Sequence, residues 1–243
     1  MPDDESILDR ASSPLDAVVR WGAGPDDVAD VRYGDPALPL VVLIHGGFWR
    51  PAYDRVHVRA TTEGLNRDGW TVVAPEYRRT PGDPDATTAD VAAALAALPG
   101  LLAGRHNGRV VVLGHSAGGH LALWAAAAAA APGLVLTVAL GAVASLALAE
   151  SADLGSGAVA AFLGGPATGR PDLDPALLPT PSSEVVLVHG AEDVVVPPEQ
   201  AAAYAAAHPR ARVVEVPGCG HFGVIDPESD AWHAVVGAVR SAP

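Results

Sequence analysis

The chain has 243 residues and a formal net charge of −13, and all 15 of its Lys and Arg positions are arginine. The negative charge disfavours nucleic acids and anionic membranes as partners. The absence of lysine excludes a Schiff-base lysine, a pyridoxal-phosphate lysine and a P-loop lysine. A single cysteine, Cys219, excludes an intramolecular disulfide and a cysteine-based zinc cluster, and it suggests no role of its own.

Apolar strand-like runs alternate with helical runs along the chain. The predicted strands are Leu40–Ile44, Thr71–Ala74, Val110–Leu113, Leu134–Leu140, Val185–His189 and Arg212–Val216, with an antiparallel hairpin edge at Asp27–Tyr33. The predicted helices are Asp54–Arg67, Thr87–Leu102 with a cap at Thr87 or Thr88, Ser116–Ala131, Pro198–Ala207 and Pro227–Arg240. This alternation predicts an α/β fold with a mostly parallel central sheet and helices on both faces.

The chain is long enough to bury a substantial core, and no segment has the composition of a linker. We therefore expect a single domain over residues 1–243, with a short irregular insert at about residues 145–183. The first thirty residues hold no apolar stretch of signal-peptide length. The uncharged run that follows Ala117 is interrupted by Pro132-Gly133, and the helical part before this break is too short to span a bilayer. These features favour a cytoplasmic protein that does not bind membranes.

The most informative motif is Gly114-His115-Ser116-Ala117-Gly118, a G-x-S-x-G sequence between a predicted strand and a predicted helix. A serine on such a turn projects its hydroxyl out of the backbone, while the glycines let neighbouring chain approach closely. The positive end of the following helix then lies where an oxyanion would develop. The context predicts that Ser116 is a nucleophile.

Two later loops at predicted strand ends supply the groups that a serine nucleophile needs. Asp193 follows the strand Val185–His189, and His221 follows the strand Arg212–Val216. An imidazole is the best base for a serine hydroxyl, and a carboxylate orients it. We expect His221 as the base and Asp193 as the orienting acid. Asp226 is expected to cap the last helix before Pro227.

These residues resemble the α/β-hydrolase superfamily, and the order of nucleophile, acid and base along the chain is the same as in that superfamily. The loop His45-Gly46-Gly47-Phe48-Trp49, together with Glu76-Tyr77-Arg78, is similar to kynurenine formamidases (arylformamidases) and related small esterases. The resemblance implies an oxyanion hole formed by the backbone N–H groups of Gly47, Phe48 and Ala117. His45, at the end of its strand, is expected to organise the glycine turn.

The expected activity is hydrolysis of a small ester or formamide through an acyl-enzyme. Phe48, Trp49 and His115 are the candidate substrate-binding residues, although Trp49 could instead pack the loop. The nine histidines lack metal-ligand spacing, so neither a metal nor another cofactor is expected. The alternatives are a general short-chain carboxylesterase, a prolyl-oligopeptidase-type peptidase, or a non-catalytic receptor of the same fold. Whether the protein is a monomer or a homodimer is left open.

Overall fold

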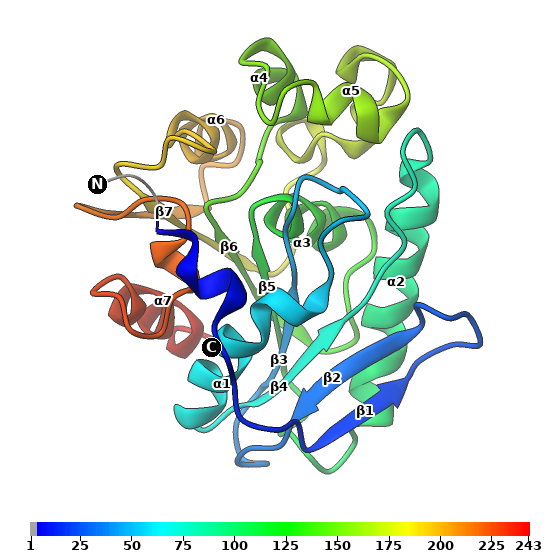
Figure 1. Ribbon diagram of the computed structural model, residues 1–243, viewed down its shortest axis with the longest axis vertical. Coiled ribbons are helices and arrows are strands. Elements are labelled where there is room, and N and C mark those ends of the chain that lie inside the picture. Colours follow the sequence, from blue (N-terminus) through cyan, green and yellow to red (C-terminus); the bar gives the residue numbers. More distant parts are fainter. Residues whose placement is uncertain (1–3) are drawn as a thin grey trace.

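The computed structural model describes residues 4–243, so residues 1–3 of the predicted domain lie outside it. One eight-stranded sheet runs through the molecule in the order β1-β2-β4-β3-β5-β6-β7-β8 (Figure 1). Its strands are β1 (Ala17–Arg20), β2 (Val28–Arg32), β3 (Leu40–Ile44), β4 (Thr71–Pro75), β5 (Val110–His115), β6 (Leu134–Leu140), β7 (Glu184–Gly190) and β8 (Arg212–Val216). The pairs β1–β2 and β2–β4 are antiparallel and all others are parallel. The mostly parallel sheet is confirmed and β2 lies within the expected edge Asp27–Tyr33, whereas β1 was not predicted.

Helices cover both faces of this sheet, and each central strand contributes alternate side chains to the two faces. The principal helices are α1 (Arg59–Arg67), α2 (Pro84–Leu101), α3 (Ala117–Ala128), α6 (Glu199–Ala207) and α7 (Trp232–Arg240). Val41 and Leu43 of β3 belong to the core layer beneath α1 and α7, whereas Val42 and Ile44 belong to the layer beneath α2 and α3. Among residues 4–243, no helix is both long and apolar enough to cross a bilayer.

Several helix boundaries differ from those expected. Helix α2 begins at Pro84 rather than Thr87, because the side chain of Asp83 accepts a hydrogen bond from the Ala86 N–H and caps it. Proline suits this first helical position because it lacks the N–H that would be unpaired there. The expected caps Thr87 and Thr88 are therefore wrong; both lie inside the helix. The turn before α1 is a 3-10 helix, η2 (Arg55–Val58).

The insert at residues 145–183 is more ordered than its Gly- and Pro-rich composition suggests. It holds two short helices, α4 (Leu146–Ser151) and α5 (Ala158–Leu163), and three 3-10 turns, η3 (Ala167–Gly169), η4 (Pro171–Leu173) and η5 (Pro175–Leu177). Both helices lie beyond the carboxyl end of the sheet in Figure 1. The insert is small, as expected, but it is not irregular throughout.

The N-terminal segment is docked on the body of the molecule by a short 3-10 helix, η1 (Glu5–Asp9). Ile7 is buried in the core layer that also holds α1 and α7. Arg10 forms a two-pronged ion pair with Asp226. The expectation that Asp226 caps the last helix is wrong, because α7 begins only at Trp232, after the turn η6 (Gly223–Ile225) and a further loop.

Candidate active site

Ser116 occupies the turn between β5 and α3, with φ 56° and ψ −120°. A non-glycine residue held at positive φ is strained, and such strain persists where the surrounding structure enforces it. The neighbouring glycines explain how the turn is packed. A Cβ on Gly114 would lie 2.2 Å from the Gly118 carbonyl oxygen, and one on Gly118 would lie 2.2 Å from the Ile44 carbonyl oxygen. Both glycines are therefore sterically required for this turn.

Asp193 and His221 are joined by a hydrogen bond of 2.7 Å between Asp193 Oδ2 and His221 Nδ1. The other carboxylate oxygen of Asp193 accepts from the N–H groups of Val195 and Val196 at 3.0 and 2.7 Å. Burial alone would raise the pKa of Asp193, but hydrogen bonds from His189, His221 and Val196 and the charge of His221 hold it well below its usual range. Asp193 is therefore an ionised acceptor that fixes the His221 ring.

Ser116 and His221 line the same pocket, which encloses about 170 Å³ at the carboxyl end of the sheet. Its remaining wall is made of residues from the N-terminal segment, the loop after β3, η2, the end of β5 and the loops after β7 and β8: Glu5, Leu8, Gly47, Phe48, Arg50, Tyr53, His57, His115, Val195 and Phe222. The sequence-predicted residues Gly47, Phe48 and His115 are thus brought together with Ser116 and His221.

The buried side chain of His115 supports the loop that carries His221. Its Nε2 lies 3.0 Å from the backbone carbonyl oxygen of His221, and the two rings are 4.6 Å apart. Because a carbonyl only accepts, His115 Nε2 is the donor. Burial, followed by the nearby charge of His221, lowers the pKa of His115 well below its ordinary value. His115 is therefore neutral, and its contact positions the loop that carries His221.

Gly141 is a site residue that was not predicted from the sequence. It follows β6 directly, has φ +48°, and a Cβ there would lie 3.2 Å from both Asp193 Oδ2 and His221 Nδ1. The Gly141 N–H donates to the Val188 carbonyl oxygen at 2.9 Å, which holds the residue against the neighbouring strand. Its position at the end of a buried strand was the available signal, because ligands bind outside the carboxyl ends of such strands.

The loop after β3 has three consecutive residues at positive φ: Gly47 at 105°, Phe48 at 49° and Trp49 at 54°. A Cβ on Gly47 would lie 2.4 Å from Tyr53 Cβ, so glycine is required there. Ala117 is the first residue of α3, where a backbone N–H has no acceptor within the helix. We call residues 46–50 the glycine loop.

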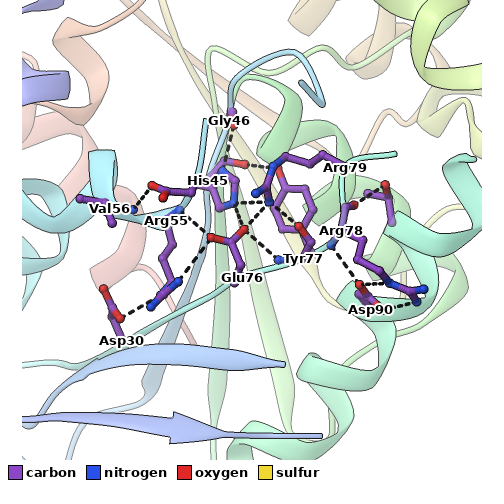
Figure 2. A network of polar contacts seen from close by, with 12 residues as sticks. Asp30, His45, Gly46, Arg55, Val56, Glu76, Tyr77, Arg78, Arg79 and Asp90 are labelled. Atoms are coloured by element: carbon purple, nitrogen blue, oxygen red, sulfur yellow. Dashed lines mark hydrogen bonds and ion pairs between the residues drawn. The ribbon is translucent and has the colours of Figure 1, made fainter. Parts of the chain in front are cut away.

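Where β3 joins the glycine loop, His45, Glu76, Arg55 and Arg79 form a buried network of polar and ionic contacts (Figure 2). His45 Nδ1 is 2.9 Å from the Gly46 carbonyl oxygen, and His45 Nε2 is 3.0 Å from Glu76 Oε1. Glu76 also pairs with Arg79 and Arg55. Burial would raise the pKa of Glu76, but the hydrogen bond and charge of His45, with Arg79 and Arg55, hold it well below its usual range. The prediction that His45 organises this turn agrees with these contacts.

Trp49 departs from its predicted role in substrate binding. Its side chain is 3 % exposed, and its ring stacks on the Phe162 ring with centroids 4.6 Å apart and an interplanar angle of 12°. Among the described residues, 4–243, Trp49 is not one of those that line the pocket. Of the two roles considered from the sequence, packing of the loop is the one that this geometry supports. The sequence could not decide between the two roles, because the partner ring comes from the insert more than a hundred residues later.

A family model described as "Alpha/beta hydrolase family" matches residues 41–238. The chain belongs to the alpha/beta hydrolase family. No curated protein matches the sequence significantly.

Several solved structures resemble nearly the whole chain. Esterase B from Lactobacillus rhamnosis is 22% identical with a TM-score of 0.78, and the match covers 98% of this chain and 89% of that one. The hyperthermophilic esterase from the archaeon Pyrobaculum calidifontis is 22% identical with a TM-score of 0.73, covering 98% and 88%. A truncated carbohydrate esterase from gut microbiota is 16% identical with a TM-score of 0.78, covering 96% and 98%. At these identities the likeness is one of fold.

Proposed function

We propose that this alpha/beta hydrolase is a serine esterase that cleaves small esters or N-formyl amides through an acyl-enzyme. The observation that carries the proposal is the Asp193–His221 hydrogen bond beside a pocket that also holds Ser116 on a positive-φ turn. An oriented imidazole next to a projecting serine is the arrangement that activates a hydroxyl nucleophile. Neither the strained turn nor the buried carboxylate–imidazole pair is needed for simple binding, which disfavours a receptor.

In the proposed reaction, His221 takes the proton of Ser116 while the serine oxygen attacks the carbonyl carbon. The carbonyl oxygen becomes an oxyanion, which the N–H groups of Gly47, Phe48 and Ala117 stabilise. His221 then gives the proton to the leaving alcohol or amine, and the acyl-enzyme is formed. A water molecule, deprotonated by the same imidazole, hydrolyses the acyl-enzyme and restores Ser116. Each N–H donor to an oxyanion is typically worth about 3 kcal/mol.

The pocket supports a small acyl group. Its volume of about 170 Å³ is below the roughly 300 Å³ at which pockets for drug-sized ligands begin. Leu8, Phe48, Val195 and Phe222 supply apolar surface, whereas Arg50 and Glu5 supply charge at the wall. The solved esterases of the same fold are in keeping with ester hydrolysis.

Within this class, kynurenine formamidase-like activity is the more specific candidate, because the His45-Gly46-Gly47-Phe48-Trp49 loop resembles that of the formamidases. The test measures formate release from N-formyl-L-kynurenine beside hydrolysis of a short-chain p-nitrophenyl ester, with Ser116→Ala as the control. Efficient formate release that depends on Ser116 would support the formamidase assignment. Ester turnover without formate release would leave a short-chain carboxylesterase. Absence of both would refute the proposed function.

A further inference from the structure

We infer that the insert at residues 145–183 holds the glycine loop in its oxyanion-binding conformation, with Phe162 and Gly155 as positioning residues. The inference rests on the proposed function, since it assigns a role to the loop whose N–H groups would bind the oxyanion. Three successive residues of the loop, Phe48, Trp49 and Arg50, contact the insert. None of these contacts involves Ser116, Asp193 or His221.

The conformation of the loop requires outside support. Phe48 and Trp49 both have positive φ and both have a Cβ. Such conformations cost an L-residue roughly 1–2 kcal/mol each. They persist only where surrounding contacts enforce them. On the strand side, His45 contacts the Gly46 carbonyl oxygen, but this contact does not reach Phe48 or Trp49.

The insert contacts each of the last three residues of the glycine loop, Phe48, Trp49 and Arg50. The Trp49 ring is stacked on the Phe162 ring of α5, with centroids 4.6 Å apart. Gly155 lies so close to Phe48 that a Cβ would come within 2.9 Å of Phe48 Cδ1. The guanidinium of Arg50 donates to the Gly155 carbonyl oxygen and lies 5.7 Å from the centroid of the Phe48 ring. Aromatic stacking, close packing and a hydrogen bond therefore converge on one short segment.

His120 of helix α3 adds a third ring to the Trp49–Phe162 pair and forms an aromatic cluster with them. The His120 ring meets Trp49 edge to face at 5.1 Å and Phe162 at 5.9 Å. Its Nε2 donates to the carbonyl oxygen of Leu173, also in the insert, at 2.8 Å. Burial lowers the pKa of His120 to about 4, so the ring is neutral at the pH where an imidazole base works. The helix that carries Ser116, the glycine loop and the insert thus share one aromatic cluster.

Hydrogen bonds contribute little to the position of the Trp49 ring. Within residues 4–243, neither Trp49 Nε1 nor His120 Nδ1 has a hydrogen-bond partner, although both atoms are buried. The orientation of Trp49 therefore depends on ring packing, above all on Phe162. Removing that ring would let Trp49 and the adjacent Phe48 N–H shift. A displacement of about 1 Å in a catalytic group can cost on the order of a hundredfold in rate.

The test compares Phe162→Ala with Val159→Ala, which truncates another buried side chain of the same helix α5. The readouts are the rate of Ser116 labelling by a fluorophosphonate, kcat and KM for p-nitrophenyl acetate, and the melting temperature. Labelling is informative because phosphonylation also develops negative charge in the oxyanion hole. Gly155→Ala is the second variant, since its new methyl group presses on Phe48 and removes no ring. Phe162→Leu replaces Phe162→Ala if the latter does not fold.

We expect Phe162→Ala and Gly155→Ala to lower kcat and the labelling rate by about 10- to 100-fold with KM nearly unchanged. Val159→Ala should lose stability but retain rates within about twofold of wild type. If both test variants matched Val159→Ala in rate, the insert would have no positioning role. If wild-type protein were not labelled at all, the proposed function would fail, and this inference with it. The two failures are therefore distinguishable.

Discussion

Replacing Gly141 by alanine tests the geometry of the Asp193–His221 pair without touching either residue. The new Cβ would lie 3.2 Å from Asp193 Oδ2, 3.2 Å from His221 Nδ1 and 3.4 Å from His221 Cε1. The two contacts at 3.2 Å are tighter than nine in ten real Cβ contacts, so the carboxylate or the imidazole must move by a few tenths of an ångström. The hydrogen bond that orients the base would then be distorted.

The substitution has two separable effects. At φ +48° an alanine costs roughly 1–2 kcal/mol of stability through its backbone alone. The displaced pair adds a catalytic loss of about tenfold in kcat/KM, since a shift of 1 Å costs on the order of a hundredfold. Gly104→Ala is the matched control, because Gly104 has φ +80° and a Cβ there would meet nothing within 4 Å.

The assay is ester hydrolysis for both variants, combined with urea unfolding. Similar stability losses are expected in the two variants, whereas the tenfold loss of kcat/KM should occur in Gly141→Ala alone. If Gly141→Ala were as active as Gly104→Ala, the proximity of Gly141 to the pair would have no catalytic consequence. The assignment of Asp193 and His221 as the working acid and base would then lose its geometric support.

Two further predictions concern stability. Burial lowers the pKa of both His57 and His120 to about 4, so the unfolded chain binds more protons than the folded one between pH 6.5 and 4. Unfolding free energy should therefore fall as pH falls through this window, by up to about 3 kcal/mol for His120, and urea unfolding at pH 7 and 5 checks this. A flat profile would contradict it. Ile7→Ala should cost about 2–4 kcal/mol because Ile7 is fully buried, while Val18→Ala on the exposed edge strand should be nearly neutral. Equal unfolding midpoints for the two variants would show that the N-terminal segment is not docked.

The sequence predicted the central strands well because they are buried on both faces. Leu40–Ile44 and Leu134–Leu140 have the same bounds in the structure as in the prediction, and so does the more exposed edge strand Arg212–Val216. The half-exposed edge strand β1 was not predicted. The parallel arrangement then placed Ser116, Asp193 and His221 at one edge, and two of these three are directly hydrogen-bonded. A continuous apolar run followed by a polar loop is a local signal, so local reasoning was sufficient.

What the sequence did not predict depends on contacts between distant segments. The N-terminal turn places Leu8 in the pocket wall only because Ile7 finds a place in the core and Arg10 pairs with Asp226. The choice between the two roles of Trp49 depends on Phe162, whose ring it stacks on. Neither partner can be found from periodicity or spacing, since each lies more than a hundred residues away.

The central claim is that Ser116 is a nucleophile activated within this pocket. The most direct measurement is the intact mass of the protein after treatment with a fluorophosphonate, followed by location of the modified peptide. We expect one adduct on Ser116 in wild-type protein and none in a folded Ser116→Ala variant. An unmodified wild-type protein, or an adduct that persists in Ser116→Ala, would contradict it.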